Sequence, residues 1–412
     1  MTFNMGGFFT DDSWTPSTII QQDPTLPVSA SLKKVESAKT SNQTDTKGES
    51  LSSLIQDALS PYKKANIEEI NQRTSFTVTA GYDDQGNPNF KDANGELIPG
   101  IYTDIPNDVY HSLPAISSSM IKKFLISPAH YYRAYVDPVN RHRTSKALER
   151  TFDAGTYAHE LILEPQGFYD HYYRELSQAE NPELLSTLEE LKSLCKDNNL
   201  KVSGTKQVLI DRLLEADPTF GNRIFDVVKK QNDEKNAGKK GIDPVVWDDA
   251  HRSCHAVRKN EWADKLLSDG IAELSVIARC PETGRMLKVR FDWLSYNGVP
   301  VDVKTSRTVN PQKFIYQFAD LKYDVQAYMY SFVGRLAGIP IPRCTFPFVS
   351  VEYNEADICE VFEMSDEDFR IAGTNYHRAI NELVDCIEND DWYGYTRGTA
   401  STIITLPKRG RV

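Results

Sequence analysis

Alternating apolar and polar residues mark a series of strands in the second half of the chain. The segments with this period are 272–280, 286–295, 299–306, 344–353 and 358–365. A period of two is typical of a strand that buries one face. The turns PETG and YNG separate the first three, which predicts an antiparallel meander. Helical periods over 247–268, 318–338 and 366–390 complete an α/β pattern.

The first hundred residues lack such periods. Residues 1–60 are rich in Ser, Thr, Asn, Gln and Asp with few clustered apolar residues, too little to bury a core. We therefore expect a disordered or variable N-terminal arm over 1–100, with a short helix near 51–65, and a compact domain over 101–412.

Residues 183–216 predict two short helices joined by the tight connection NLKVSGTK. Leucines repeat at a helical period on both sides of that connection. The charged segment 229–241 that follows is expected to be a flexible linker.

The composition restricts the classes of protein to which this chain can belong. Of the 412 residues, 25% are charged and 40% hydrophobic, an ordinary globular balance, and no apolar run reaches the ~20 residues that span a bilayer. The N-terminus has no secretory signal pattern. Six scattered cysteines without a C-x-x-C pair favour reduced thiols in a cytoplasm over a zinc or iron–sulfur site. The net charge of −11 weighs against DNA binding unless a local patch is positive.

One such patch lies between residues 122 and 150. Its cations are Lys122, Lys123, Arg133, Arg141, Arg143, Lys146 and Arg150. Three tyrosines are interleaved with them. The stretch is either a phosphate-contacting surface or a solvated helix face whose tyrosines lie in the core.

The segment GVPVDVKTS, residues 298–306, places an acid and a base two positions apart on a strand. Because strand side chains alternate, Asp302 and Lys304 share the face opposite Val301 and Val303. The pair is either a surface ion pair or a metal-binding carboxylate beside an activating lysine. Asp-x-Lys recurs three times elsewhere in the chain, so the pattern alone does not decide.

Neighbouring carboxylates favour the second interpretation. Asp292 lies on the middle strand, where it can converge with Asp302, and Glu273 begins the first strand. Carboxylates meeting beside a lysine need a compensating charge, and oxygen ligands suit Mg²⁺. His159, upstream among apolar residues, is either a core histidine or a further ligand.

The ordered series Glu273, Asp292, Asp302-x-Lys304 and Gln326-x-x-x-Tyr330, with His159 upstream, resembles the RecB-like branch of the PD-(D/E)xK nuclease superfamily. The phrases ISSSMIKKFLISPAHYY, GTYAHELILEP and YDVQAYMY extend the resemblance, over roughly residues 100–390, to RecE-like exonucleases of the exodeoxyribonuclease VIII type. This resemblance implies a PD-(D/E)xK core with a central mixed sheet and flanking helices.

The resemblance also implies roles for individual residues. His159, Asp292, Asp302 and the Val303 carbonyl would bind Mg²⁺, with Mn²⁺ as a substitute. Lys304 would be the catalytic lysine, and Glu273 would assist the metal. The residues that would contact DNA are Gln326, Tyr330, Tyr323, Lys122 and Lys123.

Residues 183–216 are similar to the SAP motif, a small helical DNA-binding module. By this resemblance Lys201 and Lys206 would contact phosphates from the connection and the second helix start. The alternative is a helical hairpin that serves only for packing.

Taken as a whole, the resemblance implies a magnesium-dependent exonuclease that digests the 5′-ended strand of linear double-stranded DNA and leaves 3′ overhangs for recombination by strand annealing. It implies a toroidal homo-tetramer, a RecT-like annealing partner, and a phage or prophage protein in a bacterial cytoplasm. The alternatives are a related nuclease acting on single strands or in defence, and a non-catalytic DNA-binding protein of the same fold.

Overall fold

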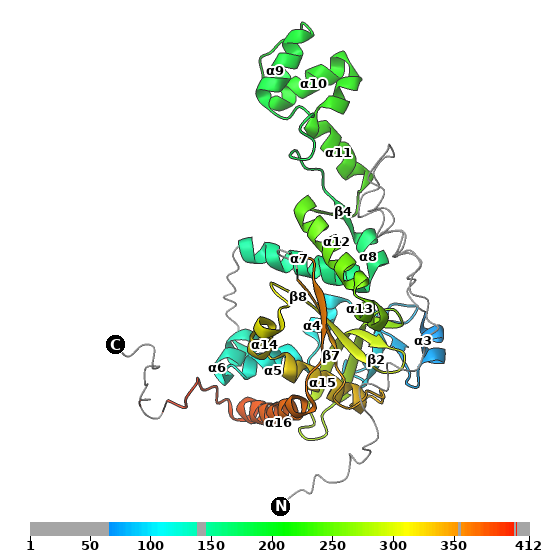
Figure 1. Ribbon diagram of the computed structural model, residues 1–412, viewed down its shortest axis with the longest axis vertical. Coiled ribbons are helices and arrows are strands. Elements are labelled where there is room, and N and C mark those ends of the chain that lie inside the picture. The colour runs from blue at the N-terminus through cyan, green and yellow to red at the C-terminus, as the bar shows by residue number, and fades with distance from the viewer. Residues whose placement is uncertain (1–65, 138–145, 353–355, 399–400, 402–412) are drawn as a thin grey trace, which may run out of the picture.

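The computed structural model describes residues 66–137, 146–352, 356–398 and 401. Eight of its described strands form a mixed sheet with the order β1-β2-β6-β7-β8-β9-β10, in which β3 pairs with the start of β7 (Figure 1). The strands are β1 (Thr79–Ala80), β2 (Gly100–Thr103), β3 (Ile116–Ser117), β6 (Gly270–Arg279), β7 (Met286–Ser295), β8 (Pro300–Ser306), β9 (Phe348–Glu352) and β10 (Cys359–Phe362).

The predicted meander is present. β6, β7 and β8 pair antiparallel in sequence order, whereas β8 and β9 pair parallel, with Asp302 beside Phe348. The α/β class and the mixed sheet are therefore confirmed.

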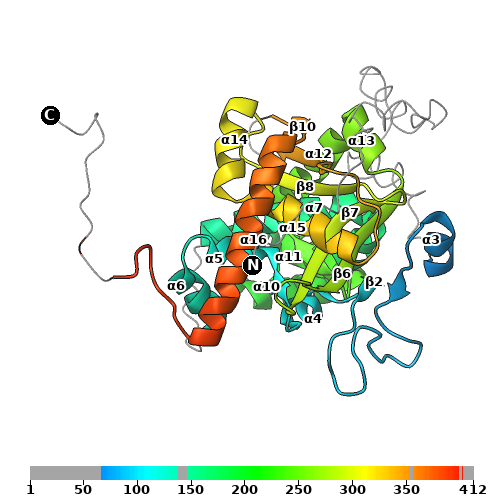
Figure 2. The same cartoon turned by 90° about the horizontal axis from the view of Figure 1, so that it is seen from below.

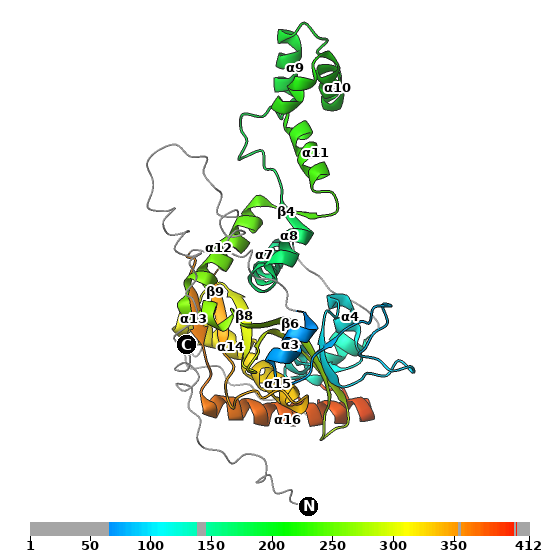
Figure 3. The same ribbon diagram turned by 90° about the vertical axis from the view of Figure 1, so that its right-hand side faces the viewer.

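Helices cover both faces of the sheet. One face carries α7 (Lys146–Leu163), α8 (Pro165–His171), α12 (Pro244–Lys259) and α13 (Glu261–Leu266), over a core that includes Val301 and Val303. The other face carries α5 (Ser118–Phe124), α15 (Tyr323–Leu336) and α16 (Asp366–Asn389), over a core that includes Val289 and Phe291. Figure 3 shows α7 and α12 on one side of the sheet and α16 on the other, and Figure 2 shows α16 laid across its face.

Smaller elements complete the domain. They are α3 (Ile67–Arg73), α4 (Asn107–Ser112), α6 (Pro128–Tyr131), the π-helix η2 (Tyr132–Val136) and α14 (Pro311–Asp320). Among the described residues, no helix is long and apolar enough to cross a membrane.

The folded region begins earlier than residue 100. α3 precedes β1, which pairs parallel with β2, and Ile70, Phe76 and Val78 are buried in the main core. The expected arm over 1–100 therefore extends too far along the chain. The prediction failed here because the apolar residues between 66 and 100 are spaced too irregularly to indicate a helix or a strand. Residues 1–65, with the expected short helix, lie outside the described residues.

Two helix predictions need correction. The expected helix over 318–338 is two helices, α14 and α15, because Lys322 between them has a left-handed backbone (φ 54°) that no α-helix continues through. The expected helix over 247–268 is α12 followed by α13, with Asn260 as the N-cap of the second.

An arm of residues 175–239 stands away from the sheet on a two-stranded parallel base, β4 (Tyr172–Arg174) and β5 (Lys240–Ile242) (Figures 1 and 3). It contains α9 (Leu188–Asp197), α10 (Lys206–Ala216), the 3₁₀-helix η3 (Pro218–Arg223) and α11 (Phe225–Lys235). The two predicted helices of 183–216 are present, but most of the predicted linker 229–241 is helical in α11.

The arm has a small core of its own. That core consists of Leu191, Leu194, Cys195, Leu209, Ile210, Leu213 and Ile224. Most leucines of 183–216 therefore pack within the arm, and none belongs to the core of the sheet.

Candidate active site

A close approach of α7 to β8 brings His159 to the sheet. A β-carbon on Gly155 would lie 2.8 Å from the Thr305 hydroxyl oxygen, so only glycine fits there without a shift. His159 follows four residues later, on the same face of the helix. Gly155 therefore allows α7 to hold the imidazole against the ends of β6 and β7.

Glu273 and Asp292 lie opposite each other on β6 and β7. The register pairs Ala272 with Trp293 and Leu274 with Phe291, which places these two acids side by side. Glu273 has a left-handed backbone (φ 51°), a conformation that costs a non-glycine residue about 1 kcal/mol or more. Such strain is concentrated at functional sites, where it aims a side chain.

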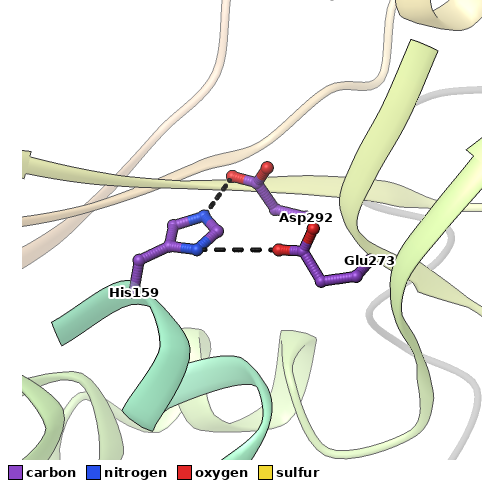
Figure 4. A group of neighbouring side chains, drawn as sticks. All are labelled: His159, Glu273 and Asp292. Carbon is purple, nitrogen blue, oxygen red and sulfur yellow. Dashed lines mark ion pairs between the residues drawn. The ribbon is translucent and has the colours of Figure 1, made fainter. Parts of the chain in front are cut away.

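His159 lies between the two carboxylates (Figure 4). Its Nε2 is 3.0 Å from Asp292 Oδ2, and its Nδ1 is 3.7 Å from Glu273 Oε1. All three side chains are half-buried, and one ligand atom from each lies within 4.8 Å of the others. The three residues thus form a cluster that is open to solvent on one side.

The charges in this cluster shift one another's pKa values. Burial alone would lower the pKa of His159, but Asp292 and Glu273 raise it to about 9. Burial raises the pKa of Glu273 to about 7 despite the nearby imidazole. Burial would also raise the pKa of Asp292, yet His159, Lys304 and the Val303 N–H hold it below its ordinary value.

The strands β7 and β8 separate at the site. Their pairing ends at Trp293 with Val301, and beyond it the Val303 N–H donates to Asp292 Oδ2 at 2.9 Å in place of a strand partner. This contact holds the Asp292 carboxylate beside the backbone that carries Asp302 and Lys304.

Asp302 and Lys304 form the second half of the site. Lys304 Nζ is 2.5 Å from Asp302 Oδ2, and Gln326 Nε2 of α15 donates to Asp302 Oδ1 at 2.6 Å. Asp302 is only 1% exposed, so the surface-pair alternative does not describe it. Burial raises its pKa to about 6, against the opposing effect of Lys304, and the pKa of Lys304 is raised, because Asp302 and Asp292 outweigh burial.

The family described as "PDDEXK-like domain of unknown function (DUF3799)" matches residues 117–402. The chain belongs to this family. The predicted PD-(D/E)xK superfamily is thus confirmed, whereas the narrower RecE-like resemblance stays a prediction.

Beyond this family, the similarity of the chain to known proteins is weak. A crystal structure of a candidate exonuclease from Eubacterium rectale matches 74% of this chain and 97% of its own, with 12% identity and a TM-score of 0.42. A similarity this weak supports no conclusion about function. No curated protein matches the chain.

The donor set of this PDDEXK-like domain suits a divalent cation. One imidazole and two carboxylates converge, and their partial exposure leaves positions for water or substrate. Asp302 is held by Lys304 and Gln326 and is not a member of the close three-residue cluster. The predicted ligand roles of Asp302 and of the Val303 carbonyl stay predictions.

The predicted DNA residues of α15 divide into two groups. Gln326 is buried in the site between Asp302 and Lys122, and the Tyr323 ring lies 5.0 Å from Lys304 Nζ. Tyr330 packs its ring edge-on against Phe291 at the edge of the main core, and Asp292, Asp302 and Glu273 help burial to raise the pKa of its hydroxyl, so it also lies beside the site. Its predicted contact with DNA stays a prediction.

The two predicted cations of α5 do not form an exposed DNA-binding surface. Lys122 is in the site, where its Nζ donates to Gln326 Oε1 at 2.8 Å. Burial and the nearby Lys304 lower its pKa to about 8. Lys123 is half-buried, and Arg141 and Arg143 lie outside the described residues.

On the arm, Lys201 is exposed in the connection before α10. Lys206 forms an ion pair with Asp226 of α11, so its charge is partly compensated within the arm. Both residues lie on the arm, which stands away from the sheet (Figure 1), and their predicted phosphate contacts stay predictions.

Sequence reasoning missed Arg290. Its charge acts on Glu273, and it is fixed by a hydrogen bond to the Ser275 hydroxyl (2.9 Å) and by the Tyr110 ring, 4.1 Å from the guanidinium carbon. Its position two residues before Asp292, on the same side of the strand, was the available signal.

Proposed function

We propose that this protein is a divalent-metal-dependent deoxyribonuclease. The observation that carries the proposal is the meeting of His159, Glu273 and Asp292 with the Asp302–Lys304 pair, at the point where β7 and β8 separate. Membership in a PDDEXK-like family supports it.

The chain's own residues suit hydrolysis of a phosphodiester. The cluster of His159, Glu273 and Asp292 would hold the cation, which when bound supplies positive charge and activates water. Lys304, fixed by Asp302, presents an ammonium group where negative charge develops on the phosphate. Gln326 in turn fixes Asp302, so the lysine is preorganised before substrate arrives.

The RecE-like series of motifs supports a narrower proposal. The enzyme would use Mg²⁺ and degrade the 5′-ended strand of linear double-stranded DNA, leaving 3′ overhangs. It would work as a ring-shaped oligomer with a RecT-like annealing protein, in a bacterial cell that carries phage or prophage genes.

The test is cleavage of a linear duplex labelled at either the 5′ or the 3′ ends, with and without magnesium. We expect early release of the 5′ label as mononucleotide, retention of the 3′ label on long single strands, and no activity without the ion. A closed circle should stay intact.

The same assay separates the competing functions. Early loss of the 3′ label, nicking of the circle, or cleavage of single strands only would contradict the 5′-directed proposal in favour of a related nuclease. Binding of DNA without cleavage under any divalent ion would indicate a non-catalytic DNA-binding protein.

A further inference from the structure

Lys122 is a half-buried ammonium group with a neutral hydrogen-bond partner. It comes from α5, on the far side of the site from α7, and its Nζ donates one hydrogen bond, to the amide oxygen of Gln326. Among the described residues, no carboxylate oxygen lies within 4.0 Å of it. Asp302, Asp324 and Asp292 act on the Lys122 charge only from beyond contact distance. A charge that is partly withdrawn from water and has no counter-ion in contact costs free energy, so an anion bound beside it would be favourable.

The ammonium groups of Lys122 and Lys304 both lie close to the Tyr323 ring. The Nζ atoms of Lys122 and Lys304 lie 5.2 and 5.0 Å from the centre of the Tyr323 ring. The Asp302 carboxylate is in contact with Lys304, and the neutral amide of Gln326 separates it from Lys122. Lys304 is therefore compensated at contact distance, whereas the charge of Lys122 is not.

We propose that Lys122 binds a phosphate of the DNA strand held in the site, through a non-bridging phosphate oxygen. A phosphodiester carries one negative charge and strong acceptor oxygens, which match an ammonium group with protons left to donate. The inference rests on the proposed nuclease function and adds a specific phosphate contact to it. The alternative is that Lys122 only positions Gln326 and, through it, Asp302.

A scan with neutral phosphates separates the two roles. Single methylphosphonate groups are placed at successive positions of a short duplex end, and affinity is measured in Ca²⁺ so that cleavage does not interfere. In the wild type we expect one or two positions near the cleavage site to weaken binding roughly tenfold or more, as loss of a charged hydrogen bond predicts.

The decisive variant is Lys122→Gln, which removes the charge but can still hydrogen-bond Gln326. At one position, the methylphosphonate that weakens binding to the wild type should no longer weaken binding to Lys122→Gln, because this variant has already lost the contact. Binding to Lys122→Arg should still be weakened at that position. Lys265→Gln, a change of an exposed lysine on α13, should leave the whole scan unchanged. If Lys122→Gln does not fold, Lys122→Met takes its place with the same expectation.

An unchanged set of penalties in Lys122→Gln overturns the inference. So does a variant that binds every duplex like the wild type but cleaves slowly at saturating DNA, because that is the behaviour of a positioning residue. The proposed nuclease function is tested by a different result. If the wild type binds DNA but never cleaves it, the nuclease function is refuted, whereas the phosphate contact of Lys122 is not. A wild type that binds no DNA refutes both.

Discussion

Gly155 and Thr305 are in such close contact that α7 and β8 leave no room for a side chain between them. The contact lies one helical turn before His159, the residue whose imidazole Nε2 is 3.0 Å from Asp292 Oδ2.

Gly155→Val should therefore weaken the metal site. The added methyl groups must push α7 from β8, at a cost of about 1–3 kcal/mol in stability, and His159 moves with the helix. We expect a higher magnesium concentration for half-maximal cleavage and a lower Tm, from metal titrations and thermal melts. Gly167→Val is the control, because a β-carbon on that α8 glycine has nothing nearer than 4.0 Å. Equal metal dependence in both variants would contradict this role.

Lys304→Ala should abolish cleavage while leaving duplex affinity within a few-fold. The ammonium group stabilises charge that develops only in the reaction, so its loss should cost at least about 10²-fold in rate. Single-turnover cleavage and equilibrium binding in Ca²⁺ measure the two effects. Cleavage by the variant at nearly the wild-type rate would show that Lys304 is not a catalytic residue.

The effect of divalent ions on stability should depend on pH. Without the ion, the pKa of His159 is raised from about 6.5 to about 9, so its pairing stabilises the fold fully below pH 6.5 and is lost as pH rises through 9. An ion needs the neutral imidazole, so the Tm gained on adding magnesium should increase between pH 6 and pH 9.

Thermal melts across this range, with magnesium or with EDTA, check the trend. His159→Gln should flatten it, whereas His171→Gln, a change of an exposed histidine on α8, should not. A gain in Tm that is constant with pH would count against His159 as a ligand.

Lys288→Met should destabilise the domain by roughly 2–4 kcal/mol. The buried Lys288 Nζ donates to the backbone oxygens of Tyr110, His111 and Leu113 at 2.8–2.9 Å, which closes the end of α4. Methionine keeps the stem but leaves these acceptors unpaired. Urea unfolding measures the loss, and Lys265→Met gives the cost of removing an exposed lysine. A loss no larger than that control would refute the capping role.

Replacing residues 176–238 by a short linker should remove DNA affinity without melting the nuclease core. The arm packs on its own small core, so the Tm of the sheet domain should stay the same. If Lys201 and its neighbours contact phosphates, the log–log salt dependence of binding should fall by about one unit per lost contact. Unchanged affinity and salt slope would show that the arm does not bind this DNA.

The sequence predicted the meander and the acids on it because strand alternation is local and strong. Val301 and Val303 pointed to the core, and Asp302 and Lys304 were correctly placed on the other face. Glu273, predicted at the start of the first strand, joins Asp292 around His159.

The features that the sequence did not predict depend on the folded backbone and on contacts between segments that are distant in the sequence. Nothing near Lys122 in the sequence shows that α5 packs beside α15, so a residue of the site was assigned to a surface track. The break at Lys322 was missed because apolar residues continue through it with a helical period, and only its left-handed backbone ends the helix. The arm's own core was not foreseen, because leucines at a helical period in α9 and α10 show that each helix buries one face but not which core that face joins.

The left-handed backbone at Glu273 places stability and activity in opposition at one residue. Glycine adopts that conformation freely, so Glu273→Gly would relieve strain in β6 while removing a carboxylate from the cluster. A search for thermostable variants of this chain would favour that substitution, and a search for activity would reject it. Screens for stability alone would thus drive this protein toward an inert fold, by way of a residue of its own active site.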